Sequence, residues 1–346
     1  MNIVTVTDAW RPQINGVVNT IARTNEQLEK LGHTVHVISP QDFRTVPLPS
    51  YPEIRLAVFP GRRVRAMLDA LNPDAVHIAT EGPLGLAARA WCLKNRFPFT
   101  TAFHTQFPEY LWLRTRIPLA FSYRLMRWFH GPATTLMVAT PTLRQRLTQW
   151  GFRNLGYWSR GVDTGLFRPR IKSYLDANRP IFLYMGRVAI EKNIEAFLKL
   201  DLPGTKYVVG SGPDLETLGR KYPAVRFTGF KSDEDLAKHV AAADVFVFPS
   251  RTDTFGLVMI EALACGVPVA AYPVQGPADV IEHGVTGCLS NDLRDAALEA
   301  LKLNPISCRE AALKYTWEVC TRQFLGHLEA ARHGADAALA ASRPAG

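Results

Sequence analysis

The stretch from Ala243 to Ala271, ADVFVFPSRTDTFGLVMIEALACGVPVAA, constrains the fold of this chain more than any other. An apolar run at 245–248 ends at Pro249, a polar turn follows, and a helical segment runs from about 256 to 265. Gly266 then precedes a second β-branched run. This order predicts a βαβ unit of a parallel sheet. Such sheets bind ligands at the carboxyl ends of their strands, where helix N-termini point N–H groups outward.

Two acidic residues lie at this predicted binding edge. Asp253 precedes the helix, and Glu261 lies on it. Anions are stabilised at a helix start, and carboxylates beside it can accept hydrogen bonds from hydroxyl groups. The backbone that opens the helix belongs to Phe255, Gly256, Leu257 and Val258.

The same alternation of strands and helices extends over the whole chain. At 346 residues, two domains are the expected arrangement. We therefore predict an α/β protein with two Rossmann-like βαβ domains that face a central cleft. The polar, glycine-rich segment 158–169 suits the crossing between domains. The expected parts are 1–165, 166–310, a C-terminal helix at 311–332 that returns to the first domain, and a flexible tail at 333–346. The last helix is expected to start near Cys308 and continue to Arg332.

Composition excludes several classes of protein. No apolar segment approaches the ~20 residues that span a bilayer, and the N-terminus has no pattern of a signal peptide. The five scattered cysteines indicate reduced, packed thiols. Lys and Arg outnumber Asp and Glu by 19 to 10 in residues 1–165 but match them 21 to 21 in residues 166–346. This basic first half indicates an anionic partner, and without a nucleic-acid-binding motif we favour a membrane surface.

Residues 107–130, FPEYLWLRTRIPLAFSYRLMRWFH, combine aromatic side chains with four arginines and a single acid, Glu109. An amphipathic segment of this kind suits the headgroup region of a membrane or a groove for a lipid acceptor. The alternative is a core element between the domains with solvated arginines. A further basic group, Arg55, Arg62, Arg63 and Arg65, precedes a short helix. The residues expected to contact acceptor or membrane are Tyr110, Trp112, Arg114, Arg116, Arg124, Arg127 and Trp128.

Several other residues follow predicted strands. Gly16 opens the first helix, where a phosphate could approach backbone N–H groups or where glycine serves only as a cap. His104 follows the strand at 99–103. In the second half, Arg187 and Lys192 supply cations suited to a diphosphate. Two further glycine-marked loops begin at Gly186 and Gly210.

Asp233 and Asp235 have the spacing of a metal-binding DxD pair. No strand directly precedes them, and Ser232 with Asp235 fits a capping box. We therefore interpret them as the start of a helix and expect no metal site.

These residues resemble the GT-B glycosyltransferases of family 4. Gly186-Arg187 with Glu191-Lys192 is similar to the family's GR-x-EK element, and the run from Asp253 to Glu261 is similar to its E-x7-E signature. The resemblance covers nearly the whole chain. Within the family, the segments His104-Thr105, 158–163 and 252–256 look most like the lipid-directed branch. That branch includes sulfoquinovosyl and hexosyl diacylglycerol synthases and related α-mannosyltransferases.

The resemblance implies roles for the marked residues, in a transfer that retains the anomeric configuration and needs no metal or other cofactor. Arg187 and Lys192 would neutralise the departing diphosphate, and His104 would lie beside the donor sugar and the acceptor. Glu261 would bind the ribose, and Asp253 the sugar hydroxyls, although the family has Glu at position 253. The implied donor-binding residues are Gly16, Gly186, Gly210, Asp253, Phe255, Gly256, Leu257, Val258 and Glu261.

The expected enzyme transfers a hexosyl or hexuronosyl group from a nucleotide sugar, with UDP favoured, to a membrane lipid, with diacylglycerol favoured. We expect it at the cytoplasmic face of the membrane. The alternative within the family is a GDP-mannose-dependent α-mannosyltransferase that acts on a lipid or a polysaccharide. An epimerase, a glycogen-type phosphorylase and a non-catalytic nucleotide-binding module remain open on the residues alone.

Overall fold

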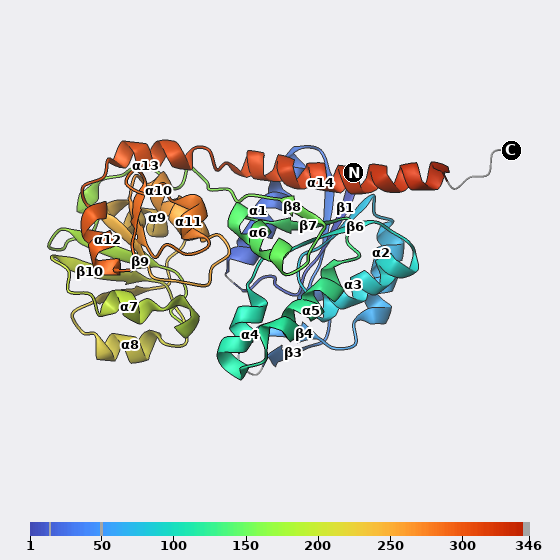
Figure 1. The fold of residues 1–346 in the computed structure, drawn as a ribbon, viewed down its shortest axis with the longest axis horizontal. Coiled ribbons are helices and arrows are strands. Elements are labelled where there is room, and N and C mark those ends of the chain that lie inside the picture. Colours follow the sequence, from blue (N-terminus) through green and yellow to red (C-terminus); the bar gives the residue numbers. More distant parts are fainter. Residues whose placement is uncertain (14, 49–50, 342–346) are drawn as a thin grey trace. The chain divides into compact units, whose positions relative to one another are not determined.

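The computed structural model describes residues 1–13, 15–48 and 51–341, and the chain divides into two compact units (Figure 1). The first unit joins Met1–Ser159 to the segment that begins at Trp317, and the second is Arg160–Thr316. The predicted first domain extended to residue 165. Residues 160–165 lie in the second unit because Val162 pairs with Thr316 there and its N–H donates to the Tyr315 carbonyl at 2.9 Å.

The first unit contains a six-stranded parallel sheet in the order β2-β1-β5-β6-β7-β8. Its central strands are buried on both faces, as expected when helices cover both sides of a parallel sheet. The strands are β1 (Asn2–Val6), β2 (Thr34–Ile38), β5 (Ala75–Ile78), β6 (Phe99–Ala102), β7 (Thr135–Val138) and β8 (Leu155–Tyr157).

Helices cover this sheet on both faces. Cores form between one face and α1 and α14, and between the other face and α2, α3 and α5; α5 and α6 enclose a third core. Asn15 caps α1 by accepting from two backbone N–H groups, and Thr140 caps α6. The helices are α1 (Gly16–Lys30), α2 (Gly61–Leu71), α3 (Pro83–Lys94), α4 (Phe107–Thr115), α5 (Leu119–His130), α6 (Pro141–Gln149) and α14 (Trp317–Ala341).

The buried carboxylate of Asp8, just after β1, determines where α3 begins. It accepts from the Leu84 N–H at 2.9 Å and from the Thr80 hydroxyl at 2.9 Å. Burial raises the pKa of Asp8. A Cβ at Gly82 would lie 2.4 Å from Asp8 Cγ, so glycine there allows the close approach. Asp8 therefore has a structural function in the first unit.

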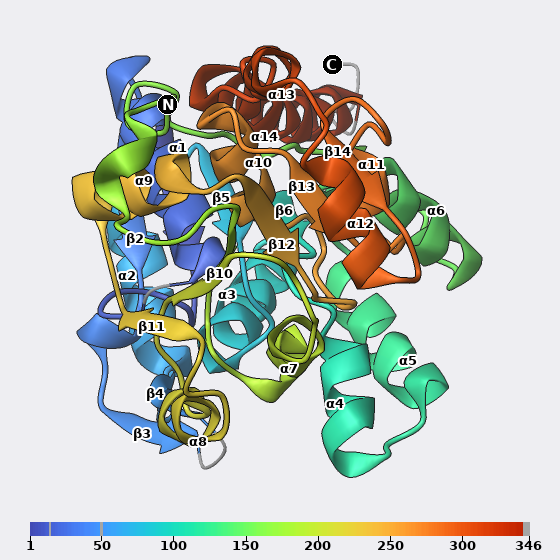
Figure 2. The ribbon, with the colours of Figure 1, turned by 90° about the vertical axis from the view of Figure 1, so that its left-hand side faces the viewer.

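The second unit repeats the design with a parallel sheet in the order β11-β10-β9-β12-β13-β14. Figure 2 shows its labelled strands side by side in this order. The strands are β9 (Ile181–Met185), β10 (Thr205–Val209), β11 (Arg226–Gly229), β12 (Val245–Phe248), β13 (Val269–Ala271) and β14 (Gly287–Leu289).

One core of the second unit joins β9, β10 and β12 to α7, α8 and α12. The helix α10 packs against α9, α13 and the strands β12 and β13. The helices are α7 (Ile194–Leu198), α8 (Leu215–Lys221), α9 (Asp233–Ala242), α10 (Leu257–Ala264), α11 (Pro277–Val280), α12 (Leu293–Ala300) and α13 (Pro305–Ala312). Both sheets have the Rossmann-like alternation that the sequence predicted.

Smaller elements were not predicted. An antiparallel pair, β3 (Thr45–Leu48) with β4 (Tyr51–Ala57), joins β2 to α2. Short 3-10 helices within the described residues are η1 (Pro40–Asp42), η2 (Lys172–Tyr174) and η3 (Ile190–Lys192).

The C-terminal region differs from its prediction. The single helix expected from about Cys308 to Arg332 is two helices, α13 and α14, because the chain between them leaves the helix to pair with Val162. The backbone of α14 continues past residue 333, where a flexible tail was predicted, to Ala341. Alanine has the highest helix propensity, which explains the extension. As predicted, this helix packs on the first unit, against α1, β5 and β6.

None of the helices in the described part of the chain combines the length and the hydropathy needed to cross a membrane.

Candidate active site

Two loops at the carboxyl edge of the second sheet meet at the Lys192 and Asp253 side chains. Lys192 lies in η3 after β9, and Asp253 lies in the turn between β12 and α10. Lys192 Nζ donates to Asp253 Oδ1 at 2.5 Å. The exposed fractions of the two side chains are 23% and 17%, so the ion pair is partly shielded from water. The structure therefore joins the GR-x-EK element to the start of the D-x7-E segment.

Two neutral hydrogen bonds hold the same loops together. Asn193 Nδ2 donates to the Pro249 carbonyl at 3.0 Å, and the Thr252 hydroxyl donates to the Glu191 carbonyl at 3.3 Å. Asn193 has a left-handed backbone with φ +51°. Neither bond was predicted, although Asn is a residue that adopts this conformation readily. These bonds and the ion pair form a clamp between residues 191–193 and 249–253.

The glycines at 186 and 210 permit two other loops to pack closely. Gly186 follows β9 with φ +147°, and Gly210 follows β10 with φ +144°. A Cβ at Gly210 would lie 1.9 Å from the Gly186 carbonyl oxygen. Arg187 is half-buried, and its carbonyl accepts from the Tyr184 hydroxyl at 2.7 Å. Close packing of the loops is thus sufficient to explain both glycines, whereas their contact with a donor stays a prediction.

The segment from Phe255 to Val258 opens α10 as expected. Phe255 is buried and its ring lies edge-on to Tyr315, with centroids 5.9 Å apart. Gly256 has φ +83°, and Leu257 and Val258 form the first turn. The first N–H groups of an α-helix have no partner within the helix. The arrangement presents backbone donors next to Asp253.

Glu261 lies one turn further along α10 and is half-buried. Its carboxylate makes no hydrogen bond or ion pair with another residue in the described part of the chain. Burial raises the pKa of Glu261 from 4.5 to about 7. A carboxylate in this state can gain stabilisation from hydroxyl groups of a ligand, because hydrogen bonds favour its ionised form.

The Asp233 and Asp235 pair begins a helix, as interpreted, but the predicted capping box is wrong. The Ser232 side chain makes no capping hydrogen bond. Asp235 instead accepts from the Tyr174 hydroxyl at 2.6 Å and pairs with Lys231 at 3.1 Å. Lys231 is a local partner, four residues before Asp235, whereas Tyr174 is 61 residues away and could not be found from the local sequence pattern.

In the first unit, His104 follows β6 and is half-buried. Its ring lies edge-on to the buried Trp158, with centroids 5.6 Å apart. Gln106 and Glu109, just beyond it, both bind Arg146 of α6. The turn that carries His104 is therefore held against the sheet and α6.

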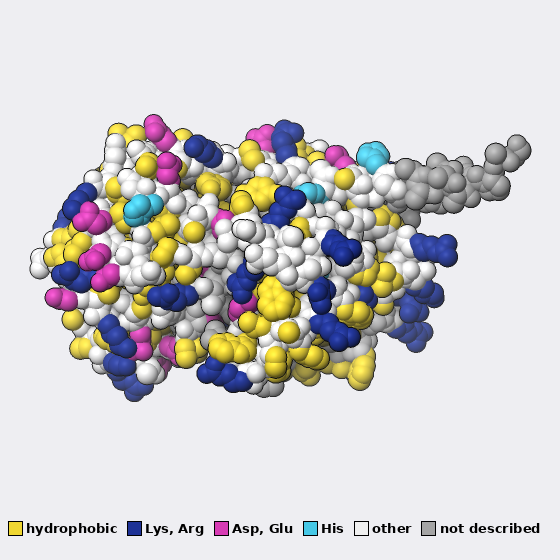
Figure 3. Space-filling model, in the orientation of Figure 1, with side chains coloured by type: hydrophobic (Ala, Val, Ile, Leu, Met, Phe, Trp, Pro, Cys, Tyr) yellow, Lys and Arg dark blue, Asp and Glu magenta, His cyan; other side chains and the backbone are white. Residues whose placement is uncertain are grey.

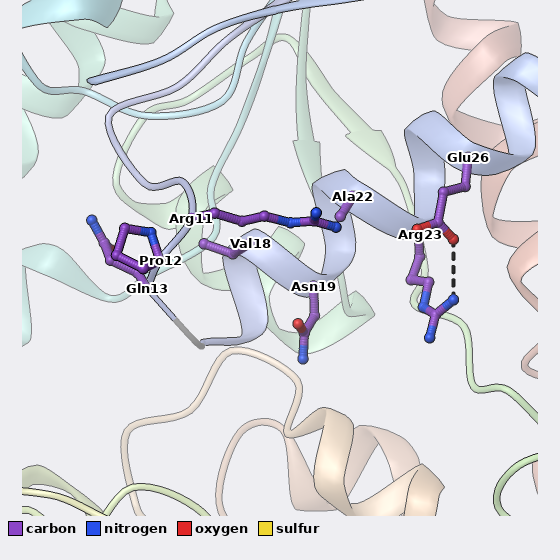
Figure 4. Close-up of a pocket in the computed structure, with 8 residues that line it drawn as sticks. All are labelled: Arg11, Pro12, Gln13, Val18, Asn19, Ala22, Arg23 and Glu26. Carbon is purple, nitrogen blue, oxygen red and sulfur yellow. Dashed lines mark hydrogen bonds and ion pairs between the residues drawn. The ribbon is translucent and has the colours of Figure 1, made fainter. Parts of the chain in front are cut away.

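Gly16 is the exposed first residue of α1, directly after the Asn15 cap. On this helix, a shallow groove of about 500 Å³ runs between α1 and residues 11–13 (Figure 4). The Arg11 side chain extends along α1 within it, and Arg23 pairs with Glu26 at 3.0 Å. Gly16 is not among the residues that line this groove, so the groove adds nothing to its predicted contact with a diphosphate.

The predicted segment 107–130 forms two helices, α4 and α5, separated at Pro118. One face of α5 packs into the first unit through residues such as Tyr123 and Met126. This face therefore belongs to a core within the first unit, whereas the alternative placed the segment in a core between the domains. The opposite face is exposed and includes Phe121, Leu125 and Trp128. The side chains of Tyr110 and Arg114 lie outside the described part.

Arginines accompany the exposed tryptophans. Arg116 lies over the Trp112 ring at 4.7 Å from its centroid. The buried Arg89 lies over Trp128 at 4.1 Å and donates to the Trp128 and Phe129 carbonyls. The sequence did not single out Arg89, although an arginine within the apolar helix PLGLAARAWCLK was a signal. Arg124 is exposed, and Arg127 donates to the Trp150 carbonyl at 2.9 Å, which caps α6.

Family models match nearly the whole chain. A model described as Glycosyltransferase Family 4 matches residues 14–166, and one described as Glycosyl transferases group 1 matches residues 168–316.

Curated relatives match over most of their length. The chain is 29% identical to a GDP-mannose-dependent alpha-mannosyltransferase of Mycobacterium tuberculosis, covering 96% of this chain and 97% of the relative. It is 27% identical to a sulfoquinovosyl transferase of Arabidopsis thaliana, with coverage of 90% and 70%. Identity to an alpha-monoglucosyldiacylglycerol synthase of Streptococcus pneumoniae is 26%, with coverage of 94% and 83%.

Solved structures share the fold. Sucrose-phosphate synthase of Thermosynechococcus elongatus superimposes with a TM-score of 0.77 at 22% identity, covering 96% of this chain and 99% of that one. HepE of Anabaena, solved in complex with UDP-glucose, gives 0.72 at 18% identity, with coverage of 95% and 99%. With two Rossmann-like sheets and both family models matched in order, the chain belongs to the GT-B glycosyltransferases of family 4, which are nucleotide-sugar-dependent hexosyltransferases.

Proposed function

We propose that the protein is a retaining glycosyltransferase that moves a hexosyl or hexuronosyl group from a UDP-sugar to diacylglycerol at the cytoplasmic face of a membrane. The family match favours transfer over epimerisation, phosphorolysis or nucleotide binding without catalysis. The proposal of a lipid acceptor depends on one observation, the exposed apolar and basic face of α5. No metal takes part in the proposed reaction, because Arg187 and Lys192 provide the positive charge.

The second unit supplies the donor chemistry in this proposal. Arg187 and Lys192 stabilise the diphosphate, Glu261 accepts from the ribose hydroxyls, and Asp253 with the start of α10 binds the sugar. The acceptor oxygen bonds to the anomeric carbon on the side from which the diphosphate departs. The sugar–phosphate bond breaks, and the acceptor proton passes to a phosphate oxygen. Charge stabilisation of the leaving group then provides most of the catalysis.

The exposed face of α5 supports a membrane acceptor. Phe121 and Trp128 are 63% and 53% exposed, and Leu125 lies between them on the same side of the helix. Arg124 adds a positive charge beside this stripe. Figure 3 shows hydrophobic side chains intermixed with those of Lys and Arg over this part of the first unit, where Figure 1 places α4 and α5. Such a surface suits an interface that is apolar inside and anionic outside.

The turn between β4 and α2 gives independent support. Phe59 is 96% exposed and has a left-handed backbone with φ +49°. Arg62, Arg63 and Arg65 follow it at the start of α2 and are exposed. An exposed aromatic ring beside three cations is a feature of binding surfaces, because only a binding partner can remove the ring from water.

The names of the relatives support both branches of the family. The Streptococcus and Arabidopsis relatives are named for a glucosyl diacylglycerol and for sulfoquinovosyl transfer. The Mycobacterium relative is named for GDP-mannose and α-mannosyl transfer. Transfer of mannose from GDP-mannose to a lipid or polysaccharide is therefore the second candidate function.

One experiment separates the two candidates. Purified protein is incubated with each of a panel of UDP- and GDP-sugars and a lipid extract, and new lipids are identified by mass. The expected product is a hexosyl or hexuronosyl diacylglycerol, formed with UDP-sugars only and in the presence of EDTA, with the donor's anomeric configuration by NMR. A mannosylated product from GDP-mannose would replace this proposal by the second candidate. Glycosylation of soluble sugars alone would exclude the lipid acceptor.

A further inference from the structure

The ion pair between Lys192 and Asp253 assigns a role to Asp253 beyond contact with the donor sugar. The ammonium group of lysine ends a flexible chain with four methylene groups, so its position depends on the groups that it contacts. Here the Asp253 carboxylate lies 2.5 Å from Lys192 Nζ, and both side chains are more than three-quarters buried. A carboxylate this close restrains the ammonium group before any ligand binds.

The remainder of the clamp makes this restraint effective. The Asn193 and Thr252 side chains each donate to a backbone carbonyl of the opposite loop, that of Pro249 and that of Glu191. The backbone under Lys192 is thus tied to the backbone that carries Asp253. Neutral hydrogen bonds at residues 191 and 193, on either side of Lys192, and the ion pair at residue 192 together fix the position of the Lys192 side chain relative to Asp253.

The residue type at position 253 agrees with this role. The family resemblance places Glu here, whereas Asp is one methylene shorter and keeps its carboxylate closer to its own loop. In this chain that carboxylate reaches Lys192. We propose that Asp253 is a positioning residue that holds the Lys192 ammonium group in place for the departing diphosphate. This inference rests on the role that the proposed function gives to Lys192.

Contact with the sugar and positioning of Lys192 have different consequences. A hydrogen bond from Asp253 to a sugar hydroxyl acts whether or not Lys192 is present. Positioning acts only through Lys192, so it disappears when Lys192 is removed. A double-mutant cycle measures this dependence directly.

The cycle compares the wild-type protein, Asp253→Asn, Lys192→Ala and the double variant by the kcat for release of nucleoside diphosphate. We expect Asp253→Asn to lower kcat at least tenfold in the wild-type background and less than threefold in the Lys192→Ala background. Asp253→Glu, which keeps the charge, should lose less than Asp253→Asn. Equal factors in both backgrounds, or a Lys192→Ala variant with wild-type kcat, would overturn the inference.

A second ion pair in the same unit serves as the control. Lys221 pairs with Glu195 at 2.6 Å on the surface. Glu195→Gln is expected to leave kcat unchanged, and thermal unfolding of every variant separates folding from positioning. Release of nucleoside diphosphate is measured with whichever acceptor the wild-type protein uses. The identity of the product therefore tests the proposed lipid acceptor. The double-mutant cycle separately tests the proposed role of Asp253.

Discussion

Gly210 and Gly186 lie against each other where β9 and β10 pass into the loops of the candidate active site. A Cβ on Gly210 would come within 1.9 Å of the Gly186 carbonyl oxygen and 2.9 Å of its carbon. Backbone bonds continue beyond the strands here, from the Gly186 N–H to Val209 and from the Val188 N–H to Ser211. The loop that carries Arg187 therefore has its position set by the neighbouring loop.

Gly210→Ala should destabilise the protein by about 3 kcal/mol, because the added methyl group forces the two loops apart at a φ that alanine rarely adopts. The free energy of unfolding in urea measures the effect. Gly219→Ala is the matched control. Gly219 lies in α8, and a Cβ there would have its nearest contact at 4.0 Å. This substitution should stabilise by about 1 kcal/mol through helix propensity, so equal effects of the two variants would contradict the steric explanation.

Lys192→Ala should lower kcat by about 10²–10³-fold with a small change in the KM for the donor. This result is expected because, in the wild-type protein, the ammonium group acts mainly on the negative charge that develops as the diphosphate departs. Steady-state kinetics with varied donor measure both constants. A proportional change in KM with kcat unchanged would show that Lys192 only binds the donor.

Glu261 should give the protein a distinctive dependence on pH. Because burial raises its pKa from 4.5 to about 7, the folded protein keeps a proton that the unfolded chain loses between these values. Stability should therefore fall by about 3 kcal/mol as pH rises from 4.5 to just above 7, and remain level at higher pH. Urea unfolding at several pH values measures this slope, which Glu261→Gln should remove.

The same group should couple nucleotide binding to proton release. Ribose hydroxyls donate to an ionised carboxylate, so binding favours loss of the Glu261 proton. Calorimetric titration with UDP and GDP at pH 6, in buffers of different ionisation enthalpy, counts the protons released. Wild-type protein should release protons and Glu261→Gln should not. Equal release from both would exclude Glu261 as the group that binds the ribose.

Replacing the exposed stripe of α5 should weaken membrane binding. Burial of a Phe or Leu side chain contributes about 1.5–3 kcal/mol, so Phe121→Ser with Leu125→Ser should reduce binding to vesicles with phosphatidylglycerol at least tenfold. Vesicle sedimentation measures the fraction of protein bound. The control pair, Ile306→Ser with Leu313→Ser, removes two exposed apolar side chains of the second unit, one in α13 and one at its C-cap. Equal losses from both pairs would argue against a specific membrane face on α5.

Local sequence patterns were sufficient for most of the fold. The apolar run at 245–248 forms β12 as predicted, and α10 and β13 follow in the expected order. Burial of this run on both faces explains why it is continuously apolar and therefore recognisable in the sequence. Where the prediction was wrong, a distant partner decided the outcome. The residues between α13 and α14 leave the helix because Val162 pairs with Thr316.

For the candidate site, the sequence by itself determined which chemical groups follow the strands: Arg187, Lys192, Asp253 and Glu261. Their residue types and the order of elements are local properties, and the parallel sheet brings strand ends to one edge. Only the tertiary structure decided that Lys192 contacts Asp253, 61 residues away, and that burial raises the pKa of Glu261 to about 7. Both depend on how loops pack after the strands have aligned, and that packing comes from contacts between segments far apart in the chain.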